Sequence, residues 1–278
     1  MKDSKFNFSP QLVFLGTGSA FPQSSFNTCF VLRDKGLLLL VDAGGGNGIV
    51  NSLRNNEIDI ESIENLFVTH THTDHILGAI WIVRSVINSF INGNTNRILN
   101  IYGNADVLGA IDRICWLTLL PEHYKIMQIV VQLRMIETKS DDYKDISGYR
   151  FRFFNVMSEN VNQTGFEVAL SNGSHFVFLG DEAITPHNMK ECINADWLVC
   201  GAFCCECDAE VFRPFEKHHH TVKEVSELSE RCSIRNLVIV HSEDSDLKHK
   251  KEKYVGEASK YFKGKVYVPQ DSEKIILY

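Results

Sequence analysis

Residues 70–75, which read His-Thr-His-Thr-Asp-His, carry the strongest chemical signal in this sequence. They follow an apolar run that is typical of a β-strand. In an extended segment, residues two apart point to the same side, so His70 and His72 can present their imidazoles to one ion. Asp74 is expected at the N-cap of the next helix, where it and His75 project into the same space. The segment holds enough ligands for two metal ions.

Imidazole nitrogen and carboxylate oxygen, without thiolate, suit zinc, manganese or iron in a site that keeps a water ligand. We therefore expect two divalent metal ions, zinc first, with manganese or iron as alternatives. The competing interpretation is a polar loop at a helix entry. Three histidines and an aspartate within six residues, between two apolar elements, disfavour that interpretation.

The six-residue segment resembles the His-x-His-x-Asp-His signature of metallo-β-lactamase fold hydrolases, and its flanks resemble the ribonuclease Z branch of that superfamily. The resemblance runs in order from about Leu12 to His241. It rests on the segments Phe-Leu-Gly-Thr-Gly-Ser-Ala at 14–20, Leu-Leu-Val-Asp-Ala-Gly at 39–44, Gly180-Asp181, His219-His220-Thr221 and Leu-Val-Ile-Val-His at 237–241.

The resemblance implies a set of metal ligands. His70 and His72 would hold one ion, Asp181 would bridge the two ions, and the second ion would be held by Asp74, His75 and His241. Asp181 and His241 each follow an apolar β run. Both therefore fall where strands end, and such ends converge at one edge of a sheet sandwich.

The same resemblance implies a metal-dependent hydrolase, with phosphodiester as the favoured bond. Two ions would share a hydroxide, because each lowers the pKa of bound water from 15.7 toward about 7. We count Asp74 and His219 as catalytic. His219 stands at the position of a catalytic histidine of the family and can donate a proton or hold a phosphoryl oxygen.

The sequence departs from the family at two supporting positions. No third histidine follows the predicted strand 149–156, so Ser158, Asn155 or water is left to complete the first ion's coordination. Cys200 and Gly201 replace a His-Glu pair that supports catalysis in ribonuclease Z proteins. A catalytically weak metal-binding relative is therefore one alternative, and a hydrolase of another ester or a lactone is a second.

A third departure concerns the substrate. Gly180 follows Ser158 by only 22 positions, which leaves no room for the long basic arm with which the tRNA-processing enzymes grip tRNA. A small phosphodiester or an RNA both stay open as substrates. The resemblance also leaves a homodimer open.

The elements that must position these residues alternate irregularly. Expected strands cover 11–16, 28–33, 37–42, 65–69, 98–102, 132–136, 149–156, 166–170, 176–179, 197–200, 236–240, 266–268 and 274–277. Expected helices cover 48–56, 76–91, 105–119, 186–193, 222–232 and 248–262. Two β-rich halves with helices predict an α+β fold, a four-layer αββα metallo-β-lactamase-like sandwich, in one domain over residues 1–278.

Composition limits the class of protein further. The 278 residues carry 28 Lys and Arg against 35 Asp and Glu, a net charge of −7. This charge disfavours binding of nucleic acid by bulk attraction. The segment Met1–Gln11 lacks the apolar core of a signal peptide, and the longest strongly apolar run, Leu37–Val41, is too short to cross a bilayer. We therefore expect a cytoplasmic protein without membrane contact.

Two further groups of residues have ordinary interpretations. Cys200, Cys204, Cys205 and Cys207 have poor spacing for a structural zinc, so we expect free, buried or half-buried thiols. The basic stretch 248–253 is expected to be a solvated helix face rather than a contact for an anionic substrate.

Overall fold

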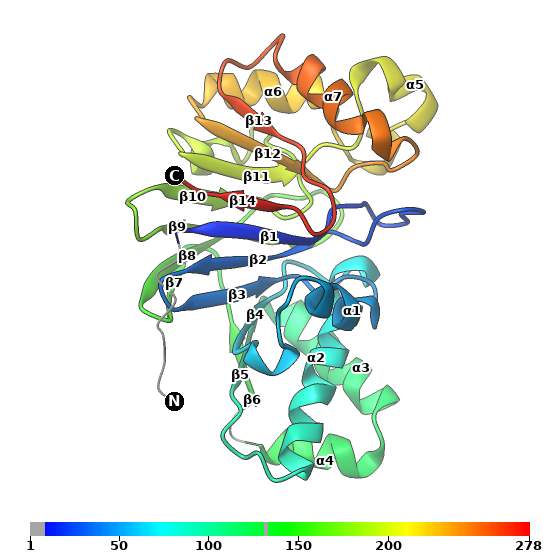
Figure 1. The fold of residues 1–278 in the computed structure, drawn as a ribbon, viewed down its shortest axis with the longest axis vertical. Helices are drawn as coiled ribbons and strands as arrows, with labels where there is room; N and C mark the ends of the chain where they lie inside the picture. Colours follow the sequence, from blue (N-terminus) through cyan, green and yellow to red (C-terminus); the bar gives the residue numbers. More distant parts are fainter. Residues whose placement is uncertain (1–8, 131–132) are drawn as a thin grey trace.

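Two seven-stranded sheets face each other, and helices cover both outer sides (Figure 1). This computed structural model describes residues 9–130 and 133–278. Most of the Met1–Gln11 segment, and Gln132 at the start of one predicted strand, lie outside the described residues. The αββα sandwich predicted from the sequence is confirmed.

The first sheet has the strand order β14-β1-β2-β3-β4-β5-β6. Its strands are β1 (Gln11–Gly16), β2 (Cys29–Asp34), β3 (Leu37–Val41), β4 (Asn65–Phe67), β5 (Leu99–Gly103), β6 (Leu133–Glu137) and β14 (Lys274–Ile276). The second sheet has the order β13-β12-β11-β10-β9-β8-β7. Its strands are β7 (Asp142–Ile146), β8 (Tyr149–Asn155), β9 (Thr164–Ala169), β10 (His175–Phe178), β11 (Trp197–Gly201), β12 (Asn236–Val240) and β13 (Lys265–Tyr267).

The helices fall into two groups by sheet. Those on the first sheet are α1 (Gly48–Asn55), α2 (Thr73–Ile91), α3 (Ala105–Thr118) and α4 (Pro121–Ile129), with the short 3-10 helix η1 (Ile60–Ser62). Those on the second are α5 (Ala209–Phe212), α6 (Val222–Arg231) and α7 (Leu247–Ala258), with the 3-10 helices η2 (Met189–Cys192), η3 (Glu206–Asp208) and η4 (Phe215–Lys217).

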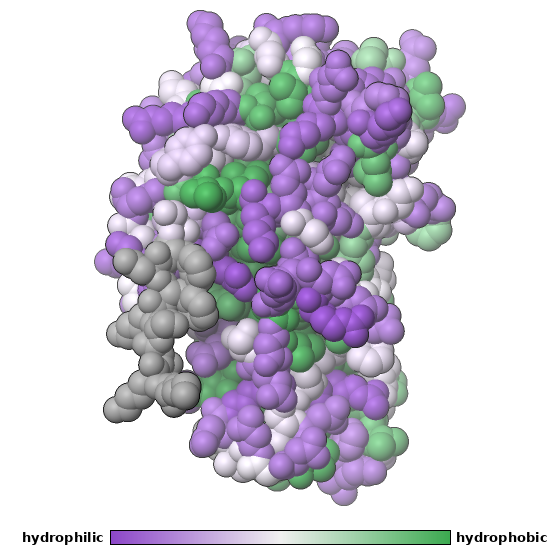
Figure 2. Space-filling view, in the orientation of Figure 1, coloured by the Kyte–Doolittle hydropathy of each residue, from purple (hydrophilic) through white to green (hydrophobic). Residues whose placement is uncertain are grey.

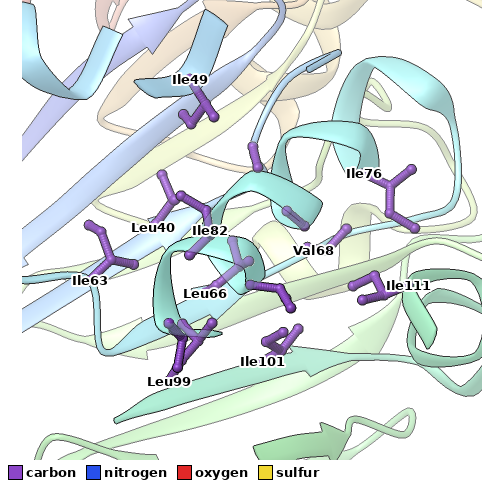
Figure 3. Close-up of a cluster of buried hydrophobic side chains, with 14 of the residues drawn as sticks. Leu40, Ile49, Ile63, Leu66, Val68, Ile76, Ile82, Leu99, Ile101 and Ile111 are labelled. Carbon is purple, nitrogen blue, oxygen red and sulfur yellow. The ribbon is translucent and has the colours of Figure 1, made fainter. Parts of the chain in front are cut away.

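Three apolar layers hold the sandwich together. Between the sheets, Phe30 and Phe178 meet edge to face with ring centroids 5.0 Å apart. Under the first helix group, Leu66 and Ile101 of the sheet pack with Ile82 of α2 (Figure 3). A third cluster joins the second sheet to α6 and α7. Alternate side chains of each central strand thus point to opposite faces of its sheet and pack into two different apolar layers.

Strand direction determines where the polar residues collect. β3 runs parallel to β4, and β10, β11 and β12 run parallel to one another. The carboxyl ends of these strands therefore lie together. Asp42 directly follows β3, His241 directly follows β12, and His70 and Asp181 come three residues after the ends of β4 and β10. A backbone bridge between Gly18 and Ser242 joins the two sheets at this edge.

The start of α2 differs from the prediction. The helix begins at Thr73 with His72 as its N-cap, so the prediction of Asp74 as the N-cap is wrong. Asp74 lies in the first turn, where the positive end of the helix dipole stabilises a carboxylate. A Cβ built on Gly78 would lie 1.8 Å from the Ala43 carbonyl oxygen, so α2 packs directly on the turn after β3.

α2 is long and apolar enough to cross a membrane by length and composition. Most of its apolar residues are buried against the first sheet, however, and its first turn carries Asp74 and His75. It is therefore a core helix. Hydrophilic residues predominate on the face of the molecule in Figure 2, with hydrophobic ones scattered among them. The cytoplasmic location stays a prediction.

Other predictions need correction. The helix expected over 186–193 is only the 3-10 turn η2, and both α4 and β7 were not expected. Lys250, expected on a solvated face, is buried and donates a hydrogen bond to the Glu243 carbonyl oxygen. All eight cysteines are free, and Cys207 is exposed whereas the rest are buried.

Candidate metal centre

The six side chains proposed as ligands lie together at the common strand edge. Their ligand atoms form two groups, within each of which all atoms lie within 4.8 Å of one another. The groups are His70, His72 and Asp181, and Asp74, His75 and His241. This is the same division that the resemblance implied. All but His72 are buried.

One carboxylate oxygen lies between the two groups. Asp181 Oδ2 is 3.7 Å from His70 Nε2, 3.8 Å from His75 Nε2 and 3.7 Å from His241 Nε2. These separations are too long for hydrogen bonds. Two donors about 2.1 Å from one tetrahedral ion lie roughly 3.4 Å apart, so the spacing suits atoms that share an ion. Asp181 has the position of a bridging ligand.

A buried histidine nitrogen points to the same use. His75 Nε2 is buried and has no hydrogen-bond partner within the part of the chain that the structure describes. Leaving a buried polar atom unsatisfied costs about 1–3 kcal/mol. A cation held between His75 and Asp74, whose Oδ2 is 3.1 Å from that nitrogen, would satisfy it. The donor set therefore fits a divalent metal.

Asp42 orients this ring from behind. The Nδ1–H of His75 donates to Asp42 Oδ2 at 2.8 Å, which leaves Nε2 facing the cluster. A carboxylate behind a ligating histidine is the usual device for fixing its tautomer. The sequence analysis includes Asp42 in the segment 39–44 that resembles ribonuclease Z, but assigns it no role at the site. Its position directly after an apolar strand, at the edge where the ligands were expected, could have indicated one.

Thr69 fixes the orientation of His70 in the same way. The Thr69 hydroxyl donates to Asp42 at 3.0 Å, so its oxygen is left to accept from the Nδ1–H of His70 at 2.9 Å. His70 Nε2 is thereby unprotonated and faces the cluster. Asp42 thus orients one histidine in each group, one directly and one through Thr69.

The electrostatics favour the ligating form of three donors, His70, Asp74 and Asp181. Burial lowers the pKa of His70 to about 3, so the ring is neutral at physiological pH. Burial acts to raise the pKa of Asp181, but the surrounding imidazoles outweigh it and hold this pKa well below its usual range. The same balance lowers the pKa of Asp74. Neutral imidazole and ionised carboxylate are the forms that bind metal. His75 differs: burial acts to lower its pKa, but Asp42 and Asp74 outweigh burial and raise it, so a metal ion must displace a proton there.

Gln163 lines the cleft and contacts Asp181. Its side-chain amide donates to Asp181 Oδ1 at 2.5 Å, and the residue is fully buried. Ser158 lines the cleft, whereas the Asn155 side chain bonds Met157 N and Asn162. Asn155 is therefore turned to local contacts, and the Gln163 amide fixes the position of the Asp181 carboxylate.

His219 lies next to the cluster but without the usual carboxylate support. Its ring stacks on Phe203 with centroids 5.2 Å apart and lies 5.1 Å from the ring of His241. Burial lowers the pKa of His219 to about 4. Its neighbours His218 and His220 pair instead with Glu159 and Glu224. The ring of His219 is thus held by aromatic contacts rather than by a carboxylate.

Gly201 shows why that pair cannot simply be restored. A Cβ built on Gly201 would lie 1.9 Å from the Asp181 carbonyl oxygen. Gly201→Ala should therefore displace Asp181, lower the stability by about 1–3 kcal/mol and weaken metal retention. Denaturant unfolding and metal analysis measure both effects. Gly109→Ala, in open space on α3, is the control and should leave metal content unchanged. Wild-type metal content in Gly201→Ala would contradict this account.

The cleft over the cluster is small. It has a volume of about 110 Å³ and is lined by His72, Asp74, Asp181, His219 and His241, with Ser158, Gln163, Glu182 and Lys217 among the other residues. Residues 159–179 form β9, β10 and the short connections around them, so no arm is inserted there. The arrangement admits a small group to the six candidate ligands.

Comparison with known proteins places these features in a family. The chain is similar to ribonuclease Z of Methanococcus aeolicus, with 34% identity over 105 residues, 37% of this chain and 31% of the relative. The first curated relatives are thus matched over about a third or less of their length. Ribonuclease Z of Listeria monocytogenes is 22% identical, over 83% of this chain and 88% of its own.

Solved structures share the whole fold at low identity. The metallo-β-lactamase fold protein YhfI of Bacillus subtilis has a TM-score of 0.76 at 16% identity, covering 96% of this chain and 99% of its own. Human tRNase Z, short form, has a TM-score of 0.70 at 21% identity, with the same coverage. Zn²⁺-bound PqqB of Methylobacterium extorquens has a TM-score of 0.70 at 12% identity, covering 95% of this chain and 99% of its own.

These likenesses confirm the predicted metallo-β-lactamase fold and the resemblance to ribonuclease Z. A family model described as "Anti-Pycsar protein Apyc1" matches residues 10–265, nearly the whole chain. The chain therefore belongs to the anti-Pycsar protein Apyc1 family, within the metallo-β-lactamase fold.

Proposed function

We propose that this protein is a metal-dependent hydrolase that cleaves small phosphodiesters. The observation that carries the proposal is the position of Asp181 Oδ2, at 3.7–3.8 Å from histidine nitrogens of both ligand groups. Such a shared carboxylate is what a two-ion site needs. Zinc suits the nitrogen and oxygen donors, with manganese or iron as alternatives.

Bound divalent ions would supply Lewis acidity and a nucleophile from water at neutral pH. The chain supplies the rest. Asp42 and Thr69 hold the imidazoles in the ligating orientation, and Gln163 holds the bridging carboxylate. His219 is placed to stabilise charge on a non-bridging oxygen by a hydrogen bond from its neutral ring, because a pKa of about 4 leaves little imidazolium at neutral pH to protonate a leaving group.

Cleft size and charge favour a small substrate. The volume of about 110 Å³ suits one phosphodiester group and its immediate neighbours. The net charge of −7 does not favour a polyanion such as tRNA. The homodimer suggested by the resemblance stays a prediction.

Metal removal tests the proposal. Dialysis against a chelator should abolish hydrolysis of bis(4-nitrophenyl) phosphate, and zinc or manganese should restore it. Metal analysis should give near two ions per chain. The loaded protein should also unfold at a higher temperature, since a ligand at 100 times its Kd stabilises by about 2.7 kcal/mol.

A substrate panel separates the alternatives. Precursor tRNA, cyclic nucleotides, phosphonates, lactones and β-lactams should be tested with the loaded protein, and the phosphodiesters of small size should be cleaved fastest. Turnover of lactones alone would overturn the phosphodiesterase assignment. Absence of bound metal at physiological zinc would favour the catalytically weak relative, because a third histidine and the His-Glu pair are missing.

A further inference from the structure

We infer that Lys217 is the residue with which this chain recognises the negative charge of its substrate, and so selects phosphodiesters over neutral esters. This inference rests on the proposed function. Lys217 ends η4 and lines the same cleft as Asp74, Asp181 and His219. None of the ion pairs in the described part of the chain involves it. Its charge is therefore available to a ligand.

The other ionisable side chains around the cleft do not supply this cation. Asp74 and Asp181 line the cleft, but the ions of the proposed function would offset their negative charge. Glu182 also lines the cleft and is not among the six candidate ligands, so its carboxylate, when ionised, repels the negative charge of a phosphodiester. His218 also lines the cleft, but its Nδ1 lies 3.1 Å from the Glu159 carboxylate and is engaged there. Lys217 is left as the side chain that can offset the repulsion.

An aromatic ring places this ammonium group beside the catalytic histidine. Lys217 Nζ lies 4.8 Å from the centroid of the Phe203 ring, the same ring on which His219 stacks. Phe203 is buried and packs edge to face on Phe212, so its position is fixed. A cation over an aromatic face is attracted by the negative charge of the ring face. Lys217 and His219 are thus held on one support at the cleft.

The backbone of this segment is also fixed. Lys217 N and His219 N both donate to the Pro214 carbonyl oxygen, at 3.0 and 2.9 Å. His218 between them is in the left-handed region, with φ 57°. This tight turn lets residues 217 and 219 approach the same ring.

The test compares Lys217→Ala and Lys217→Arg with the wild type, all loaded with metal. Lys223→Ala is the matched control. Lys223 Nζ also lies over an aromatic ring, 5.9 Å from the centroid of Tyr261, but Lys223 does not line the cleft. Kinetics with bis(4-nitrophenyl) phosphate and calorimetric binding of inorganic phosphate are the two readouts. Metal content is measured for each variant.

Lys217→Ala should raise KM about 5-fold and weaken phosphate binding by a similar factor, which is the size of effect expected of one solvent-accessible charge pair. Its kcat and metal content should stay within about twofold of wild type. Lys217→Arg and Lys223→Ala should resemble the wild type in both readouts. Addition of salt should shrink the difference between Lys217→Ala and wild type.

Unchanged KM and unchanged phosphate affinity in Lys217→Ala would overturn the inference. Loss of metal, or a fall in kcat with KM unchanged, would also overturn it, because either result indicates a structural role. Failure of the proposed function looks different. If the wild type cleaves no phosphodiester, the phosphodiesterase assignment fails, and phosphate binding still decides whether Lys217 recognises anions.

Discussion

Asp181→Ala should abolish both metal retention and hydrolysis of bis(4-nitrophenyl) phosphate. Asp181 Oδ2 is the atom common to the two ligand groups, at 3.7–3.8 Å from three histidine nitrogens. Its loss removes a ligand from each group at once. The effect on metal affinity should exceed the roughly 100-fold that loss of an outer partner of a metal ligand can cost.

Two further variants keep this experiment interpretable. Asp181→Asn preserves the shape of the side chain and removes its charge, so it should also lose metal while folding as the wild type does. Asp145→Ala changes an exposed aspartate whose side chain caps the β7–β8 turn, and it should retain full metal content. Circular dichroism confirms folding in each case. Turnover retained by Asp181→Ala would end the bridging assignment.

The sequence could predict that the six candidate ligands lie together, because each has a signal that can be read from its own segment. Three histidines and an aspartate fall within residues 70–75, and Asp181 and His241 follow apolar strands. Parallel strands end at the same edge, so the position of each residue after its strand already implied convergence. The start of α2 was missed because its N-cap is His72, which makes no side-chain cap hydrogen bond and is not among the residue types preferred at that position.

The supporting residues could not be predicted because their roles are contacts across long chain separations. Gln163 and Asp181 come from opposite sides of the β9–β10 hairpin, and an isolated glutamine carries no motif. Phe203 and His219 meet only because the chain returns after β11 to begin α6. Pairings of this kind depend on tertiary packing, which cannot be read from the spacing of hydrophobic residues along the sequence.

Two elements were missed for a different reason. β7 is an edge strand of the second sheet, so most of its residues face water and it lacks an apolar run. α4 also exposes most of its surface, and only Met127 is buried in it. Pro121 at its first turn was a usable start signal. Both elements lie away from the cluster, so the site prediction did not depend on them.

Asp42→Asn should weaken metal binding about 10–100-fold, the usual cost of removing the partner that orients a metal ligand. Asp42 accepts hydrogen bonds from Thr69 N at 2.8 Å, from the Thr69 hydroxyl at 3.0 Å and from His75 Nδ1 at 2.8 Å. The amide of asparagine can offer only one oxygen to these donors. One buried donor is left without an acceptor, which should lower the free energy of unfolding by about 1–3 kcal/mol.

Asparagine is chosen because Asp42 has φ 55°, a left-handed conformation that asparagine also tolerates. Alanine there would add backbone strain, whereas asparagine isolates the loss of the carboxylate. Asp34→Asn is the matched control. Asp34 is also a buried aspartate at a strand end, and it accepts a hydrogen bond from Ser171 N. It lies at the turn before β3, whereas Asp42 follows the other end of that strand. Asp34→Asn should lower the stability of the protein but leave its metal affinity unchanged. Equal metal affinity in the Asp34→Asn and Asp42→Asn variants would show that Asp42 acts on the fold alone.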